Sequence, residues 1–434
     1  MTEKEYPGIS EKLYSATLPN GLPVYIVPKP GYKRKFAYLA VKFGALDRQT
    51  EYFYPNEPEL KKQLDLVAGT AHFLEHKAFE TKQGCALTAL SANGALPNAY
   101  TSFDTTAYFF ECADNFYENL KILLEFVYTP CFSHDSIAKE KEVILQEIHM
   151  ANDDPDNCLF YGMMHTLFPT HPICEPILGT VESIASITAQ SLSLCHEVFY
   201  TPGNMVLCVC GDVNPEEVCD IAADVISPYE PVHLIRNYGD TNPQKTKASD
   251  FRHSMNVNLP IFLYGCKTKA ITHGKQKFTR ELLAGLSLEV LAGSSSKLYS
   301  KLYAQGLINT DFSATFDIIA DVAFVLFGGE SHSPHQVFDL LNEEISSLTT
   351  GVDTELFSGL KKMIVGSNVR TFNSFSSICS GLAHSFFYSY DMFDRLNILS
   401  SFTEDDVISF IKENLQISEM SCAVINPTNH EYEV

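Results

Sequence analysis

Strand-like and helical runs of apolar residues alternate along the first half of the chain. Residues 15–18 and 23–27 are strand-like and flank Asn20-Gly21, a dipeptide that supplies the positive φ angles of a tight hairpin turn. The periodicity of the apolar residues predicts further strands over 36–43, 98–112 and 205–210, and helices over 70–79, 116–127 and 135–151.

The second half repeats this order of elements. Its predicted elements are strands over 256–266, 313–327 and 420–425, with a long apolar helix over 279–291 between the first two strands. The final strand takes the place in the second half that residues 205–210 take in the first. The similarity lies in the order of the elements and is weak residue by residue, as expected for two domains built on one plan.

Residues 229–255 are polar, contain proline and lack both the helical and the strand periodicity, which predicts a linker. We therefore expect an α+β protein of two similar domains, over residues 1–228 and 256–434. Each domain is expected to be a mostly antiparallel sheet with helices packed on one face.

Composition limits the classes of partner. The chain has 434 residues and a formal net charge of −22, which argues against nucleic acid, because phosphate binding needs clustered Lys and Arg. We find no signal-peptide pattern in the opening residues and no apolar run long enough to span a membrane. The 12 cysteines are scattered without a C-x-x-C pair, as in a reducing compartment, so we expect a cytoplasmic protein.

The segment His72-Phe73-Leu74-Glu75-His76 carries the clearest chemical signal. On a helix its two imidazoles lie one turn apart on the same face, where both can bind one metal ion. A zinc ion held by two histidines keeps room for a water, and a nearby carboxylate can take the proton of that water. This is the H-x-x-E-H spacing of the inverzincins. The alternative is a pair of core or surface histidines beside an unrelated glutamate.

A hydrolytic zinc site usually has a third protein ligand. Glu140 and Glu147 are candidates, because seven residues are close to two helical turns and bring both side chains to almost the same face. One carboxylate could bind zinc while the other orients a histidine or the bound water. The alternative is an ordinary solvated charged face, and helical spacing alone does not choose between the two.

Several blocks of the sequence resemble the pitrilysin/insulinase family of zinc peptidases, especially its compact members related to the mitochondrial processing peptidase. The blocks in the first half are GTAHFLEHKAFE, EKEVILQEI, PNAYTSFDTTAYFF and FYTPGNMVLCVCGDVNPEE. The second half, with LAGSSSKLYSKLYAQGLIN, resembles the metal-free second domain of the family. The resemblance covers nearly the whole chain.

By matching motif positions, the resemblance implies that His72, His76 and Glu147 bind zinc. It further implies that Glu75 is the catalytic general base, and that Glu140 takes the family position beside the ligands, from which a carboxylate orients them. The implied activity is a zinc-dependent endopeptidase acting on peptides or unfolded protein segments, through a zinc-activated water.

The resemblance also places Asn98, Ala99 and Tyr100 where family members hold the substrate, by adding the peptide as an extra strand to a sheet edge. That mode uses backbone hydrogen bonds and recognises extended shape more than sequence. The alternative for these three residues is an ordinary core or edge strand.

One departure from the family pattern concerns the second half. Family members that act alone carry an Arg and a Tyr after the serine-rich turn, whereas residues 301–309 here contain no arginine and Asn309 stands near the position of the tyrosine. We therefore expect a dimer, preferentially a heterodimer with a related metal-free subunit that supplies the missing pair. The alternative function is a non-catalytic, substrate-holding subunit of a processing-peptidase-like complex.

Overall fold

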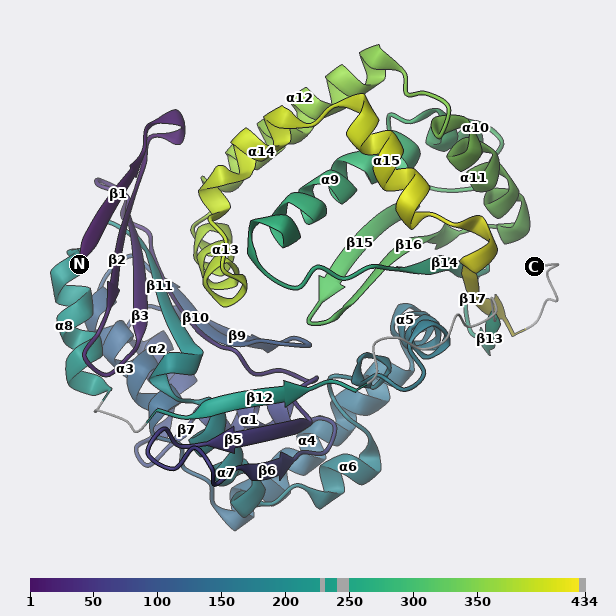
Figure 1. Ribbon diagram of the computed structural model, residues 1–434. Coiled ribbons are helices and arrows are strands. Elements are labelled where there is room, and N and C mark those ends of the chain that lie inside the picture. Colours follow the sequence, from purple (N-terminus) through teal and green to yellow (C-terminus); the bar gives the residue numbers. More distant parts are fainter. Residues whose placement is uncertain (227–230, 240–249, 429–434) are drawn as a thin grey trace. The chain divides into compact units, whose positions relative to one another are not determined.

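The computed structural model describes residues 1–226, 231–239 and 250–428, which form a mixed α+β structure dominated by antiparallel sheets (Figure 1). The chain divides into two compact units. The first unit comprises Met1–Ile148, Glu175–Tyr238 and Thr371–Phe387, and the second comprises His149–Cys174, Gly239–Arg370 and Tyr388–Val434. The units therefore interleave along the sequence.

The main sheet of the first unit has seven strands in the order β1-β2-β3-β11-β4-β10-β9. Their bounds are β1 (Thr2–Tyr6), β2 (Glu11–Thr17), β3 (Pro23–Pro28), β4 (Lys35–Val41), β9 (Leu96–Thr101), β10 (Thr106–Cys112) and β11 (Met205–Gly211). All neighbours are antiparallel except β3 and β11. The predicted hairpin and strands are confirmed, and residues 98–112 fall within a pair of strands of which β9 is the edge.

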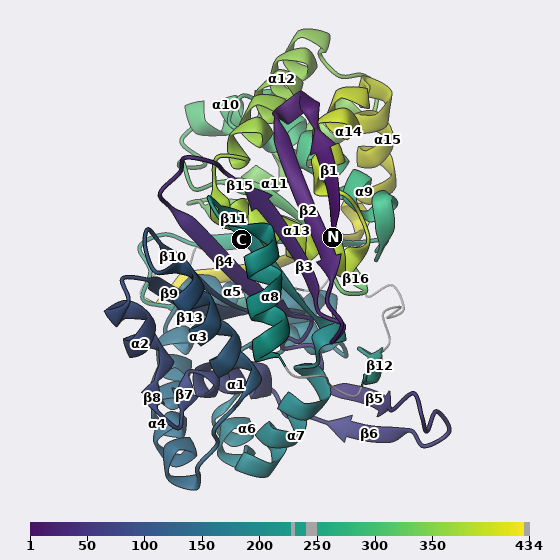
Figure 2. The same cartoon turned by 90° about the vertical axis from the view of Figure 1, so that its left-hand side faces the viewer.

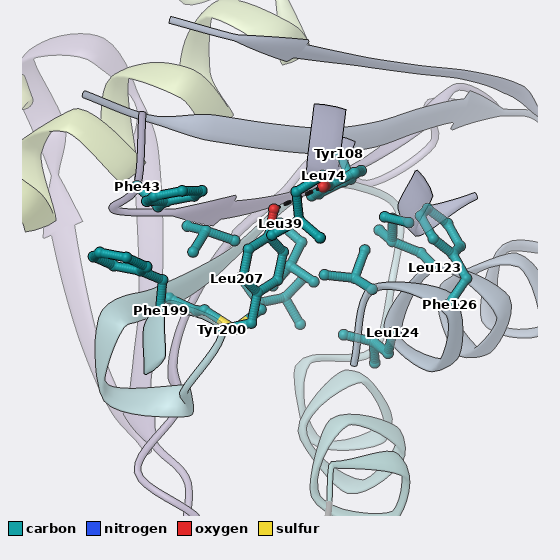
Figure 3. Close-up of a cluster of buried hydrophobic side chains, with 14 of the residues drawn as sticks. Leu39, Phe43, Leu74, Tyr108, Leu123, Leu124, Phe126, Phe199, Tyr200 and Leu207 are labelled. Carbon is teal, nitrogen blue, oxygen red and sulfur yellow. Dashed lines mark hydrogen bonds between the residues drawn. The ribbon is translucent and has the colours of Figure 1, made fainter. Parts of the chain in front are cut away.

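Helices cover one face of this sheet and enclose the core. They are α1 (Thr70–Ala78), α2 (Ala86–Ala92), α3 (Phe116–Tyr128), α7 (Ala189–Phe199) and α8 (Pro215–Val225). In Figure 3 Leu74 of α1 points into a cluster with Leu39 and Leu207 of the sheet, and the hydroxyls of Tyr108 and Tyr200 lie 2.8 Å apart. Fully burying Leu74 contributes about 1.5–3 kcal/mol, which holds α1 against the sheet.

The sheet of the second unit has the order β13-β17-β14-β16-β15. Its strands are β13 (Asp250–Met255), β14 (Ile261–Thr268), β15 (Ser313–Ile319), β16 (Val322–Glu330) and β17 (Ser421–Pro427). β17 is parallel to β13 and antiparallel to β14, just as β11 is parallel to β3 and antiparallel to β4. The predicted repeat is thus confirmed in sheet topology, with β15 in the edge position that β9 holds in the first unit.

The core of the second unit lies between this sheet and a second set of helices. They are α9 (Gly274–Ala292), α10 (Lys297–Ala304), α11 (Pro334–Leu348), α12 (Thr354–Thr371), α14 (Arg395–Ser401) and α15 (Glu404–Asn414). Phe262, Tyr264 and Cys266 alternate along β14 toward this core, as expected for a strand with one face against helices.

Each sheet also receives a helix from the other half of the sequence on its second face. Met163 of α5 (Pro155–Leu167) packs against Gly265, which points away from the core of the second unit. Phe386 of α13 (Phe375–Tyr388) lies with its ring 6.1 Å from that of Tyr25, which alternates with the core residues of β3 in the first unit. These two helices are the reason that the units interleave.

The predicted linker, residues 229–255, is partly wrong. It contains β12 (His233–Asn237), which pairs with β5 (Gln49–Phe53) in a three-stranded sheet completed by β6 (Lys62–Asp65) (Figure 2), and it also contains β13. Backbone pairing and the ion pair of Arg236 with buried Asp47, at 2.7 Å, stabilise β12, and hydrophobic periodicity detects neither. Residues 229–230 and 240–249 lie outside the described residues, and the domain boundaries at 228 and 256 remain a prediction.

The remaining strands and α-helices of the described residues are the short strands β7 (Glu80–Thr81) and β8 (Gly84–Cys85) and the helices α4 (His134–Asn152) and α6 (Val181–Ser186). None of the helices in the described part of the chain is both long and apolar enough to cross a bilayer. The cytoplasmic location stays a prediction.

Candidate metal centre

Helix α1, which carries the two histidines, begins at a glycine that packs closely against another segment of the same chain. Gly69 has φ +84°, in the left-handed region, and a Cβ built on it would lie 2.5 Å from the carbonyl oxygen of Leu178 and 2.7 Å from Cδ1 of Ile184. Since both the backbone angle and the space favour glycine, this residue fixes where α1 starts.

We expect Gly69→Ala to destabilise the protein by about 2 kcal/mol or more, because the new methyl group must displace a backbone carbonyl in addition to adopting a disfavoured φ. Gly31→Ala is the matched control: its φ is +82°, and nothing lies within 4 Å of its built Cβ. The measurement is the free energy of unfolding of both variants in urea. Equal losses in the two variants would contradict close packing at Gly69.

The structure brings His72, His76 and Glu147 together, with one ligand atom from each lying within 4.8 Å of the others. Nε2 of each histidine lies 3.7 Å from Oε2 of Glu147, which comes from α4. With zinc–ligand bonds of about 2.0–2.2 Å, two ligands of a tetrahedral ion stand about 3.4 Å apart. A small inward adjustment of these side chains would therefore hold one ion and leave a fourth position open.

The chemistry of the donor set also fits a metal. Burial lowers the pKa of His72 to about 3, with a further contribution from neighbouring His76, so His72 is neutral as a ligand must be. The Nδ1 atom of His72 is buried and has no hydrogen-bond partner among the described residues. The three donors are the types that hydrolytic zinc sites use.

Glu140 lies next to the three candidate ligands and contacts one of them. Its Oε1 is 2.9 Å from Nδ1 of His76, and this hydrogen bond is the main reason that the pKa of Glu140 is lowered. Burial opposes protonation of His76, but the bond to Glu140 and the nearby carboxylates outweigh it and raise the pKa of His76. A carboxylate on the far nitrogen of a ligating imidazole fixes the ring and its tautomer.

Lys77 lies near the second oxygen of the Glu140 carboxylate. Its ammonium group is buried, forms an ion pair with Glu80 and lies 3.9 Å from Oε2 of Glu140. Nothing in the sequence pattern explains a buried lysine directly after the histidines. The structure supplies the reason, since the charge of Lys77 stabilises the ionised form of Glu140.

Glu75 is buried beside the histidines and contacts the edge strand. Thr101, the last residue of β9, donates a hydrogen bond from Oγ1 to Oε2 of Glu75 at 2.7 Å. Burial raises the pKa of Glu75, although the bond from Thr101 opposes this. Sequence reasoning did not select Thr101, although it directly follows the three residues chosen on the same strand.

Asn98, Ala99 and Tyr100 lie on β9, whose outer edge has no strand partner in the described part of the chain. Tyr100 is 41% exposed, and its hydroxyl is 2.6 Å from that of Tyr38. Asn98 accepts a hydrogen bond through Oδ1 from the backbone N–H of Ala99. Strand β9 thus ends, at Thr101, beside Glu75 of helix α1, while in the described part of the chain its outer edge pairs with no other strand.

Residues 64–181 match the family model described as Insulinase (Peptidase family M16), and residues 186–364 match that described as Peptidase M16 inactive domain. Uncharacterized zinc protease YmfH of Bacillus subtilis (strain 168) is 34% identical over 430 residues, which cover 98% of each chain. Zinc protease PqqE of Helicobacter pylori (strain ATCC 700392 / 26695) is 26% identical over 344 residues, or 77% of this chain and 73% of PqqE.

Solved structures agree with these matches. The structure of an M16-like peptidase from Alicyclobacillus acidocaldarius superimposes with a TM-score of 0.90 at 27% identity, covering 98% of this chain and 100% of the other. A protease from Helicobacter pylori has the same fold, with a TM-score of 0.79 at 20% identity, covering 96% of this chain and 100% of the other. From the sequence relatives and the shared fold together, the chain belongs to the insulinase family of peptidases, M16.

Proposed function

We propose that the chain is a zinc-dependent endopeptidase that hydrolyses peptides or unfolded protein segments. The observation that carries this proposal is the convergence of His72, His76 and Glu147 within 4.8 Å. The carboxylate of Glu75 lies beside them, on the helix that carries the two histidines. The names of the relatives, which include zinc proteases, support the same reading.

In this proposal each residue has a defined task. His72, His76 and Glu147 hold the zinc, and Glu140 orients His76 through its 2.9 Å hydrogen bond. Bound zinc would polarise a water and the carbonyl group of the substrate. Glu75 takes a proton from the attacking water and passes it to the leaving amine, which completes hydrolysis without a covalent intermediate.

The substrate peptide is proposed to add to the outer edge of β9 along Asn98–Tyr100 as an extended strand. Because Thr101 continues this strand and bonds to Glu75 at 2.7 Å, the same strand that would hold the peptide also positions the base. The arrangement favours unfolded segments, since a chain already in a folded sheet cannot offer its backbone to β9.

We further propose that the active form is a dimer, preferentially a heterodimer with a related subunit that lacks the metal motif. Asn309, near the position of the family tyrosine, donates a hydrogen bond to Glu330 at 2.8 Å instead of offering a phenol group. No arginine lies between residues 301 and 309. A partner would have to supply both groups.

The test is chelator-sensitive cleavage of an unstructured peptide, measured for the assembly purified from the native cell and for the isolated chain. We expect about one zinc per chain, loss of cleavage with a chelator and recovery on adding zinc. Strong cleavage by the isolated chain would argue against the heterodimer. A zinc-loaded native assembly that never cleaves would contradict the endopeptidase and favour the substrate-holding alternative.

A further inference from the structure

The second unit contains a cavity of about 340 Å³ between helix α9 and the edge strand β15. Ligand pockets in proteins measure about 300–1,000 Å³, so this cavity suits a single side chain better than a large cofactor. β15 is the edge strand of its sheet, as β9 is in the first unit, and in the described part of the chain its outer side pairs with no strand.

The cavity holds one negative charge that is not balanced. Glu281 lines it, but its carboxylate is ion-paired with the buried ammonium of Lys277. Glu289, two turns further along α9, also lines it and has no hydrogen bond or ion pair among the described residues. Burial raises the pKa of Glu289, so a cation entering the cavity would stabilise its charged form.

Gly293 leaves the space that the carboxylate of Glu289 occupies. A Cβ built on Gly293 would overlap Oε2 of Glu289. The backbone of Gly293 has φ −65°, which any residue can adopt, but the built Cβ would also lie 2.6 Å from the backbone carbonyl oxygen of Glu289. Glycine at this position therefore leaves room both for the backbone carbonyl group and for the carboxylate of Glu289.

Aromatic side chains form part of the same lining. Tyr299, Phe312 and Phe316 all line the cavity, and the ring centroids of Tyr299 and Phe312 are 6.3 Å apart. Aromatic faces attract ammonium and guanidinium groups. A single carboxylate with aromatic neighbours therefore matches a singly charged organic cation.

We propose that this cavity binds the side chain of a lysine or arginine in a peptide that lies extended along the free edge of β15. Residues Ser313, Ala314 and Phe316 of that strand line the cavity, so a peptide added there can hydrogen-bond to the strand and direct one side chain inward. The inference deepens the proposed function and rests on it for peptide as the ligand: it makes substrates with a basic residue the preferred ones.

The test measures peptide binding to the full chain carrying Glu75→Gln, so that cleavage does not interfere. The protein contains no tryptophan, so the fluorescence of a tryptophan in the peptide reports binding without background. One peptide carries a single lysine, and the other carries norleucine, its uncharged equivalent, at the same position. We expect the lysine peptide to bind about 10-fold more tightly.

Glu289→Gln keeps the shape of the side chain and should remove this difference. Glu413→Gln, an exposed glutamate on α15, is the matched control and should retain it. Unfolding temperatures of both variants establish that they fold. Equal binding of the two peptides, binding of neither, or a preference that survives Glu289→Gln would each overturn the proposal. Because no cleavage is measured, such a result leaves chelator-sensitive cleavage by the native protein, and hence the proposed function, standing on its own.

Discussion

His72→Ala is expected to abolish stable zinc binding and all peptide cleavage. His72 is one of three donors within 4.8 Å, and its removal leaves two, which is too few for the three-ligand sites typical of hydrolytic zinc. Loss of a residue that merely supports a ligand typically costs 10–100-fold in metal affinity. We expect the loss on removing this ligand to exceed about 100-fold.

The measurement is the zinc content by elemental analysis after dialysis, together with competition against a chelator of known affinity. Glu140→Gln serves as the comparison with a smaller expected effect. It should lower the affinity for zinc by about 10–100-fold while leaving all three ligands in place. Since Nδ1 of His72 has no hydrogen-bond partner among the described residues, the metal-free variant should unfold within about 1 kcal/mol of the metal-free parent. A His72→Ala protein that keeps one tightly bound zinc would refute the assignment.

Helix α1 and its two histidines were predictable because the pattern that indicates them lies within one short segment of the sequence. The positions of His72, Glu75 and His76 relative to one another follow from helix geometry alone, and the predicted helix over 70–79 is confirmed as Thr70–Ala78. The spacing of Glu140 and Glu147 was weaker evidence for a metal site. It places both side chains on one side of a helix but does not indicate what that side contacts. The structure places Glu147 near both histidines and Glu140 on the far side of His76.

Contacts between distant segments could not be predicted from periodicity. The bond from Thr101 to Glu75 joins a strand to a helix 26 residues away, and Lys77 reaches Glu140 from another helix. The same limit explains the exchanged helices α5 and α13. Their apolar faces predict burial, but nothing in the pattern indicates that each covers the sheet of the unit formed mainly by the other half of the chain.

The sequence pattern missed strand β12, inside the predicted linker, for a different physical reason. β12 gains stability from backbone hydrogen bonds to β5 and from the bond of Arg236 to buried Asp47, and only a minority of its side chains are apolar. A method that looks for apolar alternation reads such a segment as polar coil. Edge strands held by polar contacts are therefore the elements for which sequence reasoning is weakest.

Glu75→Gln is expected to retain zinc and to lose cleavage by about 10²- to 10⁴-fold in kcat, the range typical of general acid–base catalysis. Glutamine has nearly the shape of glutamate, and its carbonyl oxygen can still accept the hydrogen bond from Thr101. It cannot take a proton from the attacking water. The expected result is therefore a folded, metal-loaded and peptide-binding protein that does not turn over.

Three measurements on one preparation distinguish loss of the base from loss of folding or of the metal site. They are the zinc content, the dissociation constant of an uncleaved peptide, and kcat. Glu142→Gln, an exposed glutamate on α4, controls for the loss of a negative charge near the site and should keep full activity. Loss of zinc together with activity would make Glu75 a structural support of the metal site rather than the base. Turnover at the parental rate in zinc-loaded Glu75→Gln would remove it from the mechanism, because no proton acceptor would then be needed at that position.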